Sequence, residues 1–535
     1  MELEFSKLAR RLRDEMNQTV EVAVSRYNPD LDNKPRHEKY EVPYTRGMVV
    51  LDALHYIYEN KDSSLAYRWN CRTGQCGSCS IMVNGKPKPA CRTIIESGQS
   101  YLLEPLRHFP VVRDLVVDLD RGVSRLQKIR PYVNRVKPAP RPERIPRQEA
   151  DKVAELRKCI ECWSCVAACP AVVDAWQEFI GPLGVRKLAS LEFDPRDVED
   201  RARIAFMSGI YDCTTCGACK ESCIKDINVR KDAIEALRAL AVDRGYGPLP
   251  GHASIIQNVE TTGYSVEKQS TPFTEMVPDV VKVEDPVDEV VLFPGCLMNL
   301  RIQNVATNVV EVLRRNRVQV KIPKEFQCCG SVLFRTGARA TAGKLVTQNV
   351  DYLEKLGTKK VVGLCPGCMT TIKQDWPLVL HEIGHAPYKF KAMDINEYLV
   401  HDLGIDNLNT EDLHPVNVTV TYHDPCHLNR GQGISKEPRA LLKLIPRLRF
   451  VETKESDRCC GSGGGVRAGR RPLSFEIGDR KIKSMADTGA DAFVTSCSFC
   501  AIQLIDGAGR LGLKQKIFNV TDLLAMSYRG ERVAG

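Results

Sequence analysis

Twenty-two cysteines in this 535-residue sequence fall into five groups with regular spacing. Cysteine thiolates bind iron and zinc, and they can also pair as disulfides. The N-terminal sequence contains no apolar run long enough for a signal peptide, so we expect a cytoplasmic protein in a reducing compartment. In such a compartment a large, even number of cysteines indicates metal ligands. The spacing within each group then indicates the kind of metal site.

The first group has the spacing Cx4CxxC and a fourth cysteine further along, in the segment CRTGQCGSCSIMVNGKPKPAC. Plant-type ferredoxins hold a [2Fe-2S] cluster with this spacing. Gly74 and Gly77 would let backbone amides curl toward the cluster sulfurs. A zinc site is the weaker interpretation, because zinc motifs usually come as paired CxxC units. The predicted ligands are Cys71, Cys76, Cys79 and Cys91.

The second and third groups share the spacing CxxCxxCxxxC, in CIECWSCVAACP and CTTCGACKESCI. Two-cluster bacterial ferredoxins carry such runs, and the fourth cysteine of each run binds the other cluster. We therefore predict two cubane [4Fe-4S] clusters. The ligands of the first are Cys159, Cys162, Cys165 and Cys223. The ligands of the second are Cys213, Cys216, Cys219 and Cys169.

The fourth and fifth groups are two copies of one pattern, related by offsets of 130 to 132 residues. Five thiolates in each copy are one more than a tetrahedral zinc site takes, and adjacent cysteines suit two metal ions better than one. A multi-iron cluster is the preferred interpretation, and zinc in one copy stays open. The first pentad is Cys296, Cys328, Cys329, Cys365 and Cys368. The second pentad is Cys426, Cys459, Cys460, Cys497 and Cys500.

Each pentad lies in a segment where short apolar runs alternate with helical patterns. The first copy has the runs EVVLF, VQVKI and VVGL, and the second has VTVTY, RFVET and AFVTS. This alternation predicts a parallel sheet with helices on its faces. Every cysteine group follows the C-terminal end of a predicted strand, which is where open α/β sheets bind ligands.

The chain is too long for one hydrophobic core, so several domains are expected. We predict domains over residues 1–125, 126–260, 288–405 and 415–535. The formal charge of +9 is spread along the whole chain, and no basic stretch is interleaved with aromatics. Nucleic-acid binding is therefore not expected, although a basic face could help to dock an acidic partner.

The N-terminal segment predicts a short amphipathic helix with Leu3, Leu8, Leu12 and Met16 on one face. No window of the sequence approaches the 18 or so consecutive apolar residues of a membrane-spanning helix. We therefore predict a protein without a membrane span.

The first three cysteine groups resemble those of the iron–sulfur subunit of succinate dehydrogenases and fumarate reductases. That family usually lacks a cysteine at the position of Cys216 and holds a [3Fe-4S] cluster there, so Cys216 implies a [4Fe-4S] cluster instead. The two pentads resemble the catalytic subunit of heterodisulfide reductase, which is built from two cysteine-rich CCG domains. In that family each CCG domain binds a noncubane [4Fe-4S] cluster through five cysteines, and the coenzyme M/coenzyme B disulfide is cleaved between the two clusters.

The fusion of these halves is similar to the iron–sulfur subunits of thiol:fumarate reductases in methanogenic archaea. The resemblance implies a multidomain α+β and α/β protein. Its parts would be a β-grasp [2Fe-2S] ferredoxin domain, an α-helical two-cluster ferredoxin domain, and two repeated α/β CCG domains. It also implies that coenzyme M and coenzyme B thiols are oxidised at the CCG domains. The chain has no credible flavin fingerprint, so FAD and fumarate reduction would reside on a flavoprotein partner subunit.

Three further residues are candidates for the site where these thiols bind. His427 follows a cluster cysteine in YHDPCHL and could move a proton, or it could only hydrogen-bond to backbone or a cluster sulfur. Arg430 and Arg467 lie near the second pentad in sequence and could bind the sulfonate and phosphate of the thiols, or they could be ordinary surface arginines. The segment GSGGGVRAG does not match a phosphate-binding loop, and its glycines are predicted to let backbone approach the second cluster.

Other functions fit parts of this sequence. A relay for a quinone-linked succinate dehydrogenase is disfavoured, because no amphipathic or apolar tail follows residue 520. An iron–sulfur subunit of a 2-hydroxy acid dehydrogenase is disfavoured by the N-terminal [2Fe-2S] segment. A heterodisulfide reductase with another electron donor stays open, because the same clusters would serve in the reverse direction.

Overall fold

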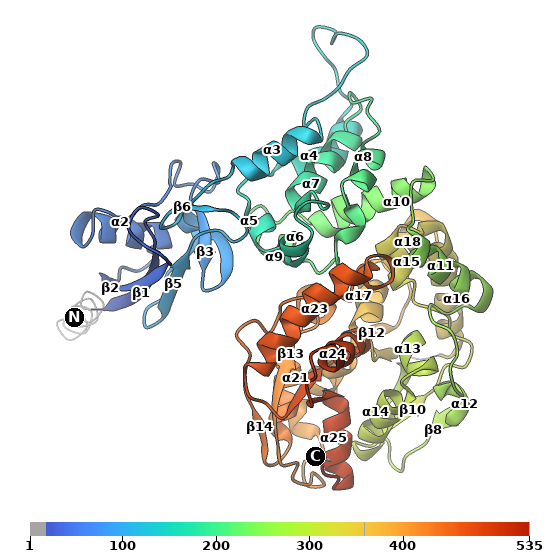
Figure 1. Cartoon of the computed structure of the whole chain (residues 1–535). Coiled ribbons are helices and arrows are strands. Elements are labelled where there is room, and N and C mark those ends of the chain that lie inside the picture. The colour runs from blue at the N-terminus through green and yellow to red at the C-terminus, as the bar shows by residue number, and fades with distance from the viewer. Residues whose placement is uncertain (1–17, 358, 534–535) are drawn as a thin grey trace, which may run out of the picture. The chain divides into compact units, whose positions relative to one another are not determined.

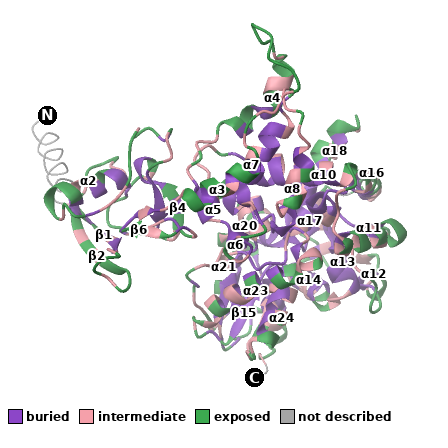
Figure 2. Cartoon of the chain, turned by 45° about the horizontal axis from the view of Figure 1, so that its top comes forward, coloured by how far each residue is buried: buried purple, intermediate pink, exposed green. Residues whose placement is uncertain are grey.

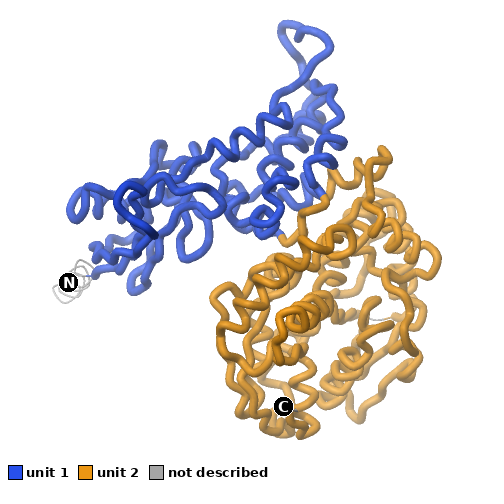
Figure 3. Tube along the Cα trace, viewed as in Figure 1, with its two compact units in different colours: residues 1–210, 217–234 blue, residues 211–216, 235–535 orange. Residues whose placement is uncertain are grey.

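A computed structural model describes residues 18–357 and 359–533 of the chain. The predicted helix through Leu3, Leu8, Leu12 and Met16 lies outside the described residues. The chain divides into two compact units (Figure 3). Unit 1 comprises residues 1–210 and 217–234, and unit 2 comprises residues 211–216 and 235–535.

A five-stranded sheet begins unit 1, with the strand order β2-β1-β5-β3-β4 (Figure 1). Alternating valines of β1 are buried, as the sequence predicts for a strand with one face on a core. The β3–β4 hairpin turns at Asn84 and Gly85, which both have positive φ. The bounds are β1 (Thr19–Arg26), β2 (Arg36–Pro43), β3 (Ser80–Val83), β4 (Lys86–Pro89) and β5 (Ser100–Glu104), with a separate pair β6 (Val111–Arg113) and β7 (Val116–Val117).

Helix α2 (Val50–Asn60) covers this sheet, and the part of unit 1 that follows β7 is helical. Helix α7 (Gly181–Glu192) is almost wholly buried and forms the centre of the helical part (Figure 2). The other helices are η1 (Ala90–Arg92), α3 (Asp120–Lys128), α4 (Arg147–Arg157), α5 (Ser164–Ala167), α6 (Pro170–Asp174), α8 (Arg201–Met207) and α9 (Ala218–Glu221), with η2 (Ile210–Asp212) and η3 (Val229–Glu235) where the chain passes between units.

Unit 2 contains two sheets that repeat one topology, which we call the first and second repeat. The first has the order β12-β11-β9-β10-β8, and the second has β14-β13-β15-β16. All described strands of these two sheets pair in parallel except β8, which is antiparallel to β10. The strands are β8 (Val280–Val281), β9 (Asp288–Phe293), β10 (Val318–Lys321), β11 (Lys360–Gly363), β12 (Lys391–Asp394), β13 (Val418–His423), β14 (Leu448–Phe450), β15 (Ala492–Thr495) and β16 (Lys516–Asn519).

All six apolar runs of the repeat form strands, so the predicted parallel sheets are confirmed. The central strands are buried on both faces, which explains why their runs are continuously apolar. The sequence interpretation missed β12 and β16, whose short sequences KAMD and KIFN carry little apolar pattern.

The helices of unit 2 flank these sheets (Figure 1). They are α10 (Ala236–Asp243), α11 (Pro250–Thr262), α12 (Phe273–Met276), α13 (Gly295–Leu300), α14 (Gln303–Arg315), α15 (Ser331–Thr336), α16 (Arg339–Lys355), α17 (Pro366–Gln374), α18 (Trp376–Glu382), α19 (Ile395–Glu397), η4 (Tyr398–Asp402), η5 (Ile405–Asn407), α20 (Cys426–Gln432), α21 (Lys436–Leu444), α22 (Val466–Gly469), α23 (Arg471–Ala486), α24 (Ser498–Arg510) and α25 (Val520–Arg529). Among the described residues, no helix is both long and apolar enough to cross a bilayer.

Candidate active site

The loop before β3 in unit 1 presents thiols to backbone amides. The N–H groups of Thr73, Gln75 and Cys76 donate to Cys71 Sγ at 3.4, 3.3 and 3.3 Å. Hydrogen bonds from Thr73 and its neighbours lower the pKa of the Cys71 thiol to about 6. A loop that stabilises thiolates with amide donors fits an anionic iron–sulfur cluster.

The helical part of unit 1 brings four cysteines around one small cavity. Cys159, Cys162, Cys165 and Cys223 all line a cavity of about 30 Å³. These are the residues that the crossed pattern assigns to one cubane cluster. The [2Fe-2S] loop lies close to them, because a Cβ at Gly77 would come within 2.8 Å of Cys162 Cα.

The third cysteine group divides between the units. Cys213 and Cys216 belong to unit 2, and Cys219 belongs to unit 1. Within unit 2 the fully buried Arg238 guanidinium donates to three backbone carbonyls, those of Cys213 at 2.7 Å, Arg335 at 2.6 Å and Gly464 at 2.9 Å. Arg238 therefore joins the segment that carries Cys213 and Cys216 to both repeats.

A cavity in unit 2 has a volume of about 450 Å³, and all ten cysteines of the two pentads line it. They reach it from the C-terminal ends of β9, β10, β11, β13, β14 and β15, as the sequence predicts. Nine of the ten are buried, and Cys426 is half-buried. One chamber thus contains two sets of five sulfur donors.

The CxxC motif of each repeat lies at the start of a helix. Cys365 is the N-cap of α17 and Cys497 is the N-cap of α24, so each thiol lies at the positive end of the helix dipole. A contact with Cys368, a second with Cys497, and amide donors of the first turn lower the pKa of the Cys365 thiol well below its ordinary value. The Cys365–Cys497 contact also shows that the two pentads meet.

Within each pentad, some cysteine sulfurs lie close enough to share a metal ion. Cys460 Sγ and Cys500 Sγ are 3.4 Å apart, for example. Two sulfurs bound to one tetrahedral metal are about 3.8 Å apart when each metal–sulfur bond is about 2.3 Å, so these two sulfurs lie slightly closer than such a pair. The donor sets therefore fit metal centres bound by thiolates.

The three non-cysteine candidates differ in where they lie. His427 lines the cavity, and its backbone carbonyl accepts hydrogen bonds from Thr370 Oγ1 at 2.6 Å and Gln432 Nε2 at 3.2 Å. Arg467 also lines the cavity, but its guanidinium binds Gln503 and Asp506. Arg430 is not among the lining residues.

Arg430 instead donates to the backbone oxygen and the carboxylate of Asp457, at 2.8 and 2.9 Å. Its closeness in sequence to Cys426 therefore does not bring it into the cavity. Two other lining arginines were not identified from the sequence. The first, Arg335, is buried between Glu235 and Asp375, with both ion pairs at 2.7 Å, so its charge is compensated.

Arg471 is the second arginine that sequence reasoning missed. It lines the cavity at the start of α23, stacks on the Phe475 ring at 5.3 Å, and has no ion pair with a described carboxylate. Its positive charge is therefore available to an anionic ligand. The sequence feature that could have identified Arg471 is its position just after GSGGGVRAG, the loop that also lines the cavity.

Glycines of that loop line the cavity, and they also allow a second close approach that the sequence did not predict. A Cβ at Gly464 would lie 2.5 Å from the Cys213 carbonyl oxygen, and one at Gly463 would lie 2.7 Å from that of Thr214. The missing side chains thus allow the loop to approach the segment with Cys213 and Cys216. Cys459 Sγ lies 3.4 Å from Thr214 Oγ1 and also contacts Cys216.

Three domain families match successive parts of the chain. Residues 21–124 match the 2Fe-2S iron–sulfur cluster binding domain, residues 155–227 match the 4Fe-4S dicluster domain, and residues 290–373 and 420–505 match the cysteine-rich CCG domain. These matches and the site define a multidomain iron–sulfur oxidoreductase.

Curated relatives identify the family. A subunit of the fumarate reductase (CoM/CoB) of Methanothermobacter marburgensis is 38% identical over 95% of this chain and 99% of its own length. The chain belongs to the family of that fumarate reductase subunit. A subunit of the dihydromethanophenazine:CoB–CoM heterodisulfide reductase of Methanosarcina barkeri is 32% identical over 70% of this chain and 95% of its own length.

One relative covers only part of this chain, and one solved structure shares its fold. The fumarate reductase iron–sulfur subunit of Haemophilus influenzae is 38% identical over 39% of this chain and 88% of its own length. A crystal structure of a hypothetical protein from Helicobacter pylori matches 96% of this chain and 95% of that chain with a TM-score of 0.63. At 12% identity this last likeness shows the fold alone.

Proposed function

We propose that this protein is the iron–sulfur subunit of a fumarate reductase that oxidises two thiols, coenzyme M and coenzyme B, to their mixed disulfide. The observation that carries the proposal is the single cavity lined by both pentads. Two thiols lose two protons and two electrons to form one S–S bond, and fumarate takes up the same number to become succinate. When bound, clusters at the cysteine sites would transfer these electrons one at a time.

We further propose that each pentad holds a noncubane [4Fe-4S] cluster, with zinc in one pentad as the alternative. The tetrads would hold one [2Fe-2S] and two cubane [4Fe-4S] clusters, in a β-grasp and an α-helical domain. This divides the chain as residues 1–125, 126–260, 288–405 and 415–535. Fumarate reduction would then take place on a flavoprotein partner subunit that carries FAD.

Contacts within the units support an order for the electron path. Cys459 of the second pentad contacts Cys216, so electrons from the cavity would leave toward the cubane site with Cys213 and Cys216. In unit 1 the close approach of Gly77 to Cys162 supports a step from the other cubane site to the [2Fe-2S] site. From there electrons would pass to the flavoprotein.

The cavity also supports binding of anionic thiols. Arg471 supplies an uncompensated positive charge, whereas Arg335 and Arg467 are paired with carboxylates. Backbone N–H groups of the loop after Cys460 add donors that can bind a sulfonate or phosphate. We propose Arg471 as the main anion-binding residue, with Arg467 in a supporting role. Arg430 is held by Asp457, and neither residue lines the cavity.

His427 is proposed to accept the thiol proton. It lines the cavity next to Cys426, where a substrate sulfur would approach. His427→Ala should keep the iron content but lose fumarate reduction driven by the paired thiols, while dye-linked fumarate reduction persists. Unchanged thiol-linked activity would remove His427 from the mechanism.

The decisive experiment is anaerobic purification of the native complex, followed by fumarate reduction assays with the paired thiols, with quinol and with 2-hydroxy acids. We expect turnover only with the thiols and FAD in the partner subunit. A flavin-free partner, or turnover that does not need thiols, would refute the proposal. Disulfide reduction with another electron donor is a second candidate, favoured by the likeness to the heterodisulfide reductase subunit of Methanosarcina barkeri, and the same complex tests it in the reverse direction.

A further inference from the structure

His423 is a buried histidine that the function proposed above does not use. It is the last residue of β13 and pairs in parallel with Thr495 of β15. Its side chain is fully buried, and neither ring nitrogen has a hydrogen-bond partner among the described residues. Buried polar groups in proteins are nearly always satisfied, so a buried imidazole of this kind indicates a missing partner.

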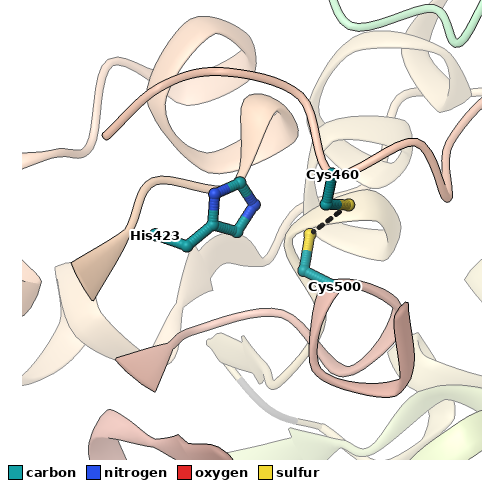
Figure 4. Close-up of side chains that lie close together, drawn as sticks. All are labelled: His423, Cys460 and Cys500. Atoms are coloured by element: carbon teal, nitrogen blue, oxygen red, sulfur yellow. Dashed lines mark hydrogen bonds between the residues drawn. The ribbon is translucent and has the colours of Figure 1, made fainter. Parts of the chain in front are cut away.

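The ring of His423 faces two cysteines of the second pentad (Figure 4). One ring nitrogen and the sulfurs of Cys460 and Cys500 all lie within 4.8 Å of one another. The two sulfurs are 3.4 Å apart. A metal ion bound by two thiolates and one imidazole requires bonds of about 2.3 Å to sulfur and about 2.0–2.1 Å to nitrogen. The 3.4 Å between the two sulfurs fits two such bonds at one ion. The same bond lengths let the imidazole nitrogen share that ion when it lies within about 4.4 Å of each sulfur.

The contacts of Cys460 agree with ligation. Its thiol contacts the thiols of Cys459 and Cys500 and the imidazole of His423. The thiolate form of Cys460 is the form that binds metal. Neutral imidazole is also a common ligand of iron and zinc.

The first repeat supplies an internal comparison. Its CC pair and CxxC motif are complete, and Cys329 contacts Cys368 as Cys460 contacts Cys500. The residue equivalent to His423 is Phe293, the last residue of β9, which pairs with Gly363. The Phe293 ring packs against Phe326 with 5.1 Å between centroids, in the hydrophobic core. No nitrogen donor is therefore available at that position of the first repeat.

We propose that the second repeat forms a mixed nitrogen–sulfur metal centre, in which His423 is a ligand beside Cys460 and Cys500, whereas the first centre is bound by sulfur alone. This inference rests on the metal centre in the proposed function and not on its substrates. Replacement of one thiolate ligand by the neutral imidazole of His423 would raise the reduction potential of this centre. The two centres would then differ in potential, with the more oxidising one next to Cys216.

The test uses the anaerobically purified complex with full-length chains, made with and without ¹⁵N-labelled histidine. Iron and zinc per chain are counted, and pulsed EPR on partly reduced samples measures the nitrogen hyperfine coupling. We expect a strong coupling that changes with the label, is lost in His423→Phe and persists in His427→Gln. His423→Phe copies the residue of the first repeat, and His427→Gln removes a histidine that lines the cavity.

The outcomes are separable. A wild-type protein without strong histidine coupling at this centre overturns the proposal, as does a coupling that survives in His423→Phe. If the centre contains zinc, the zinc-edge X-ray absorption spectrum must show a nitrogen ligand, and an all-sulfur shell overturns the proposal. If His423→Phe loses the metal, His423→Cys should restore the metal content without the nitrogen signal, and failure to do so counts against ligation.

Thiol-dependent fumarate reduction is measured on the same preparations. Activity without histidine coupling would remove the nitrogen ligand and leave the proposed function in place. A histidine coupling without thiol-dependent activity would keep the nitrogen ligand and refute the proposed function.

Discussion

The two repeats have the same strand order and complete cysteine pentads, yet the residues beside those cysteines differ. In the first repeat, helix α15 follows Cys329 almost directly and buries Leu333 and Phe334. In the second repeat, the equivalent positions are Gly464 and Gly465, and they form a loop. The loop makes room for the backbone of residues 213 and 214.

The two repeats therefore carry the same five cysteines in different surroundings. Only in the second repeat does the loop lack side chains, so that the backbone of Cys213 can lie close to the CC pair. It also has His423 where the first repeat has Phe293, and Asp457 where the first has Phe326. The first repeat thus has an apolar core beside its cysteines, and the second has polar contacts with the segment that carries Cys213 and Cys216.

The largest expected effect comes from adding a side chain at Gly464. Gly464→Ala would place a Cβ 2.5 Å from the Cys213 carbonyl oxygen, at a φ of +65°. We expect a loss of about 4 kcal/mol of unfolding free energy and a lower iron content, measured by thermal unfolding and iron analysis.

Gly489→Ala is the matched control, because its φ is +68° and no heavy atom lies within 4 Å of the added Cβ. It should cost only the backbone strain, about 1–2 kcal/mol. Equal losses in both variants would mean that the close approach to Cys213 is unimportant.

The second effect concerns the ends of the last strands. Asp394 ends β12 and is buried, and burial raises its pKa to about 7. The equivalent residue of β16 is Asn519. Because the folded-state pKa is above the ordinary value, the stability contribution is present at low pH and is lost as the pH rises through 7.

Between pH 5 and pH 8, the free energy of unfolding of wild type should fall because Asp394 ionises in its buried site. Asp394→Asn lacks this ionisation, so over the same pH range it should gain about 2–3 kcal/mol relative to wild type. Asparagine can still cap helix α19, as Asn519 caps α25. Thermal unfolding across this pH range gives the measurement. Parallel pH profiles of variant and wild type would contradict the burial argument.

The smallest effect concerns the arginines of the cavity. Arg471→Ala should raise the KM for the anionic thiols about 10- to 30-fold, because one charge-assisted contact is lost. The equivalent residue of the first repeat, Arg339, does not line the cavity, so Arg339→Ala should leave KM unchanged. Arg467→Ala should change KM less than Arg471→Ala, since Asp506 already compensates its charge. Steady-state kinetics of the complex would measure these KM values, and equal KM changes in the three variants would contradict the predicted order.

Much of the fold and the cysteine clustering could be predicted from local patterns. Apolar runs such as EVVLF and VTVTY became the central parallel strands, because a strand buried on both faces must be apolar throughout. The last strand of each repeat could not be predicted, since KAMD and KIFN are short and mixed in character. Arg430 shows a second limit: it is four residues from Cys426, yet its guanidinium is held by Asp457.

The sequence by itself determined the number and grouping of the cysteines, because the spacing of cysteines within a loop or helix turn is a local property of the chain. Only the tertiary structure decided that both pentads share one cavity, that Cys216 contacts Cys459, and that His423 faces Cys460. These contacts join segments up to 243 residues apart in sequence, between Cys216 and Cys459. Such neighbours are set by how the sheets and helices pack, and no local pattern encodes them.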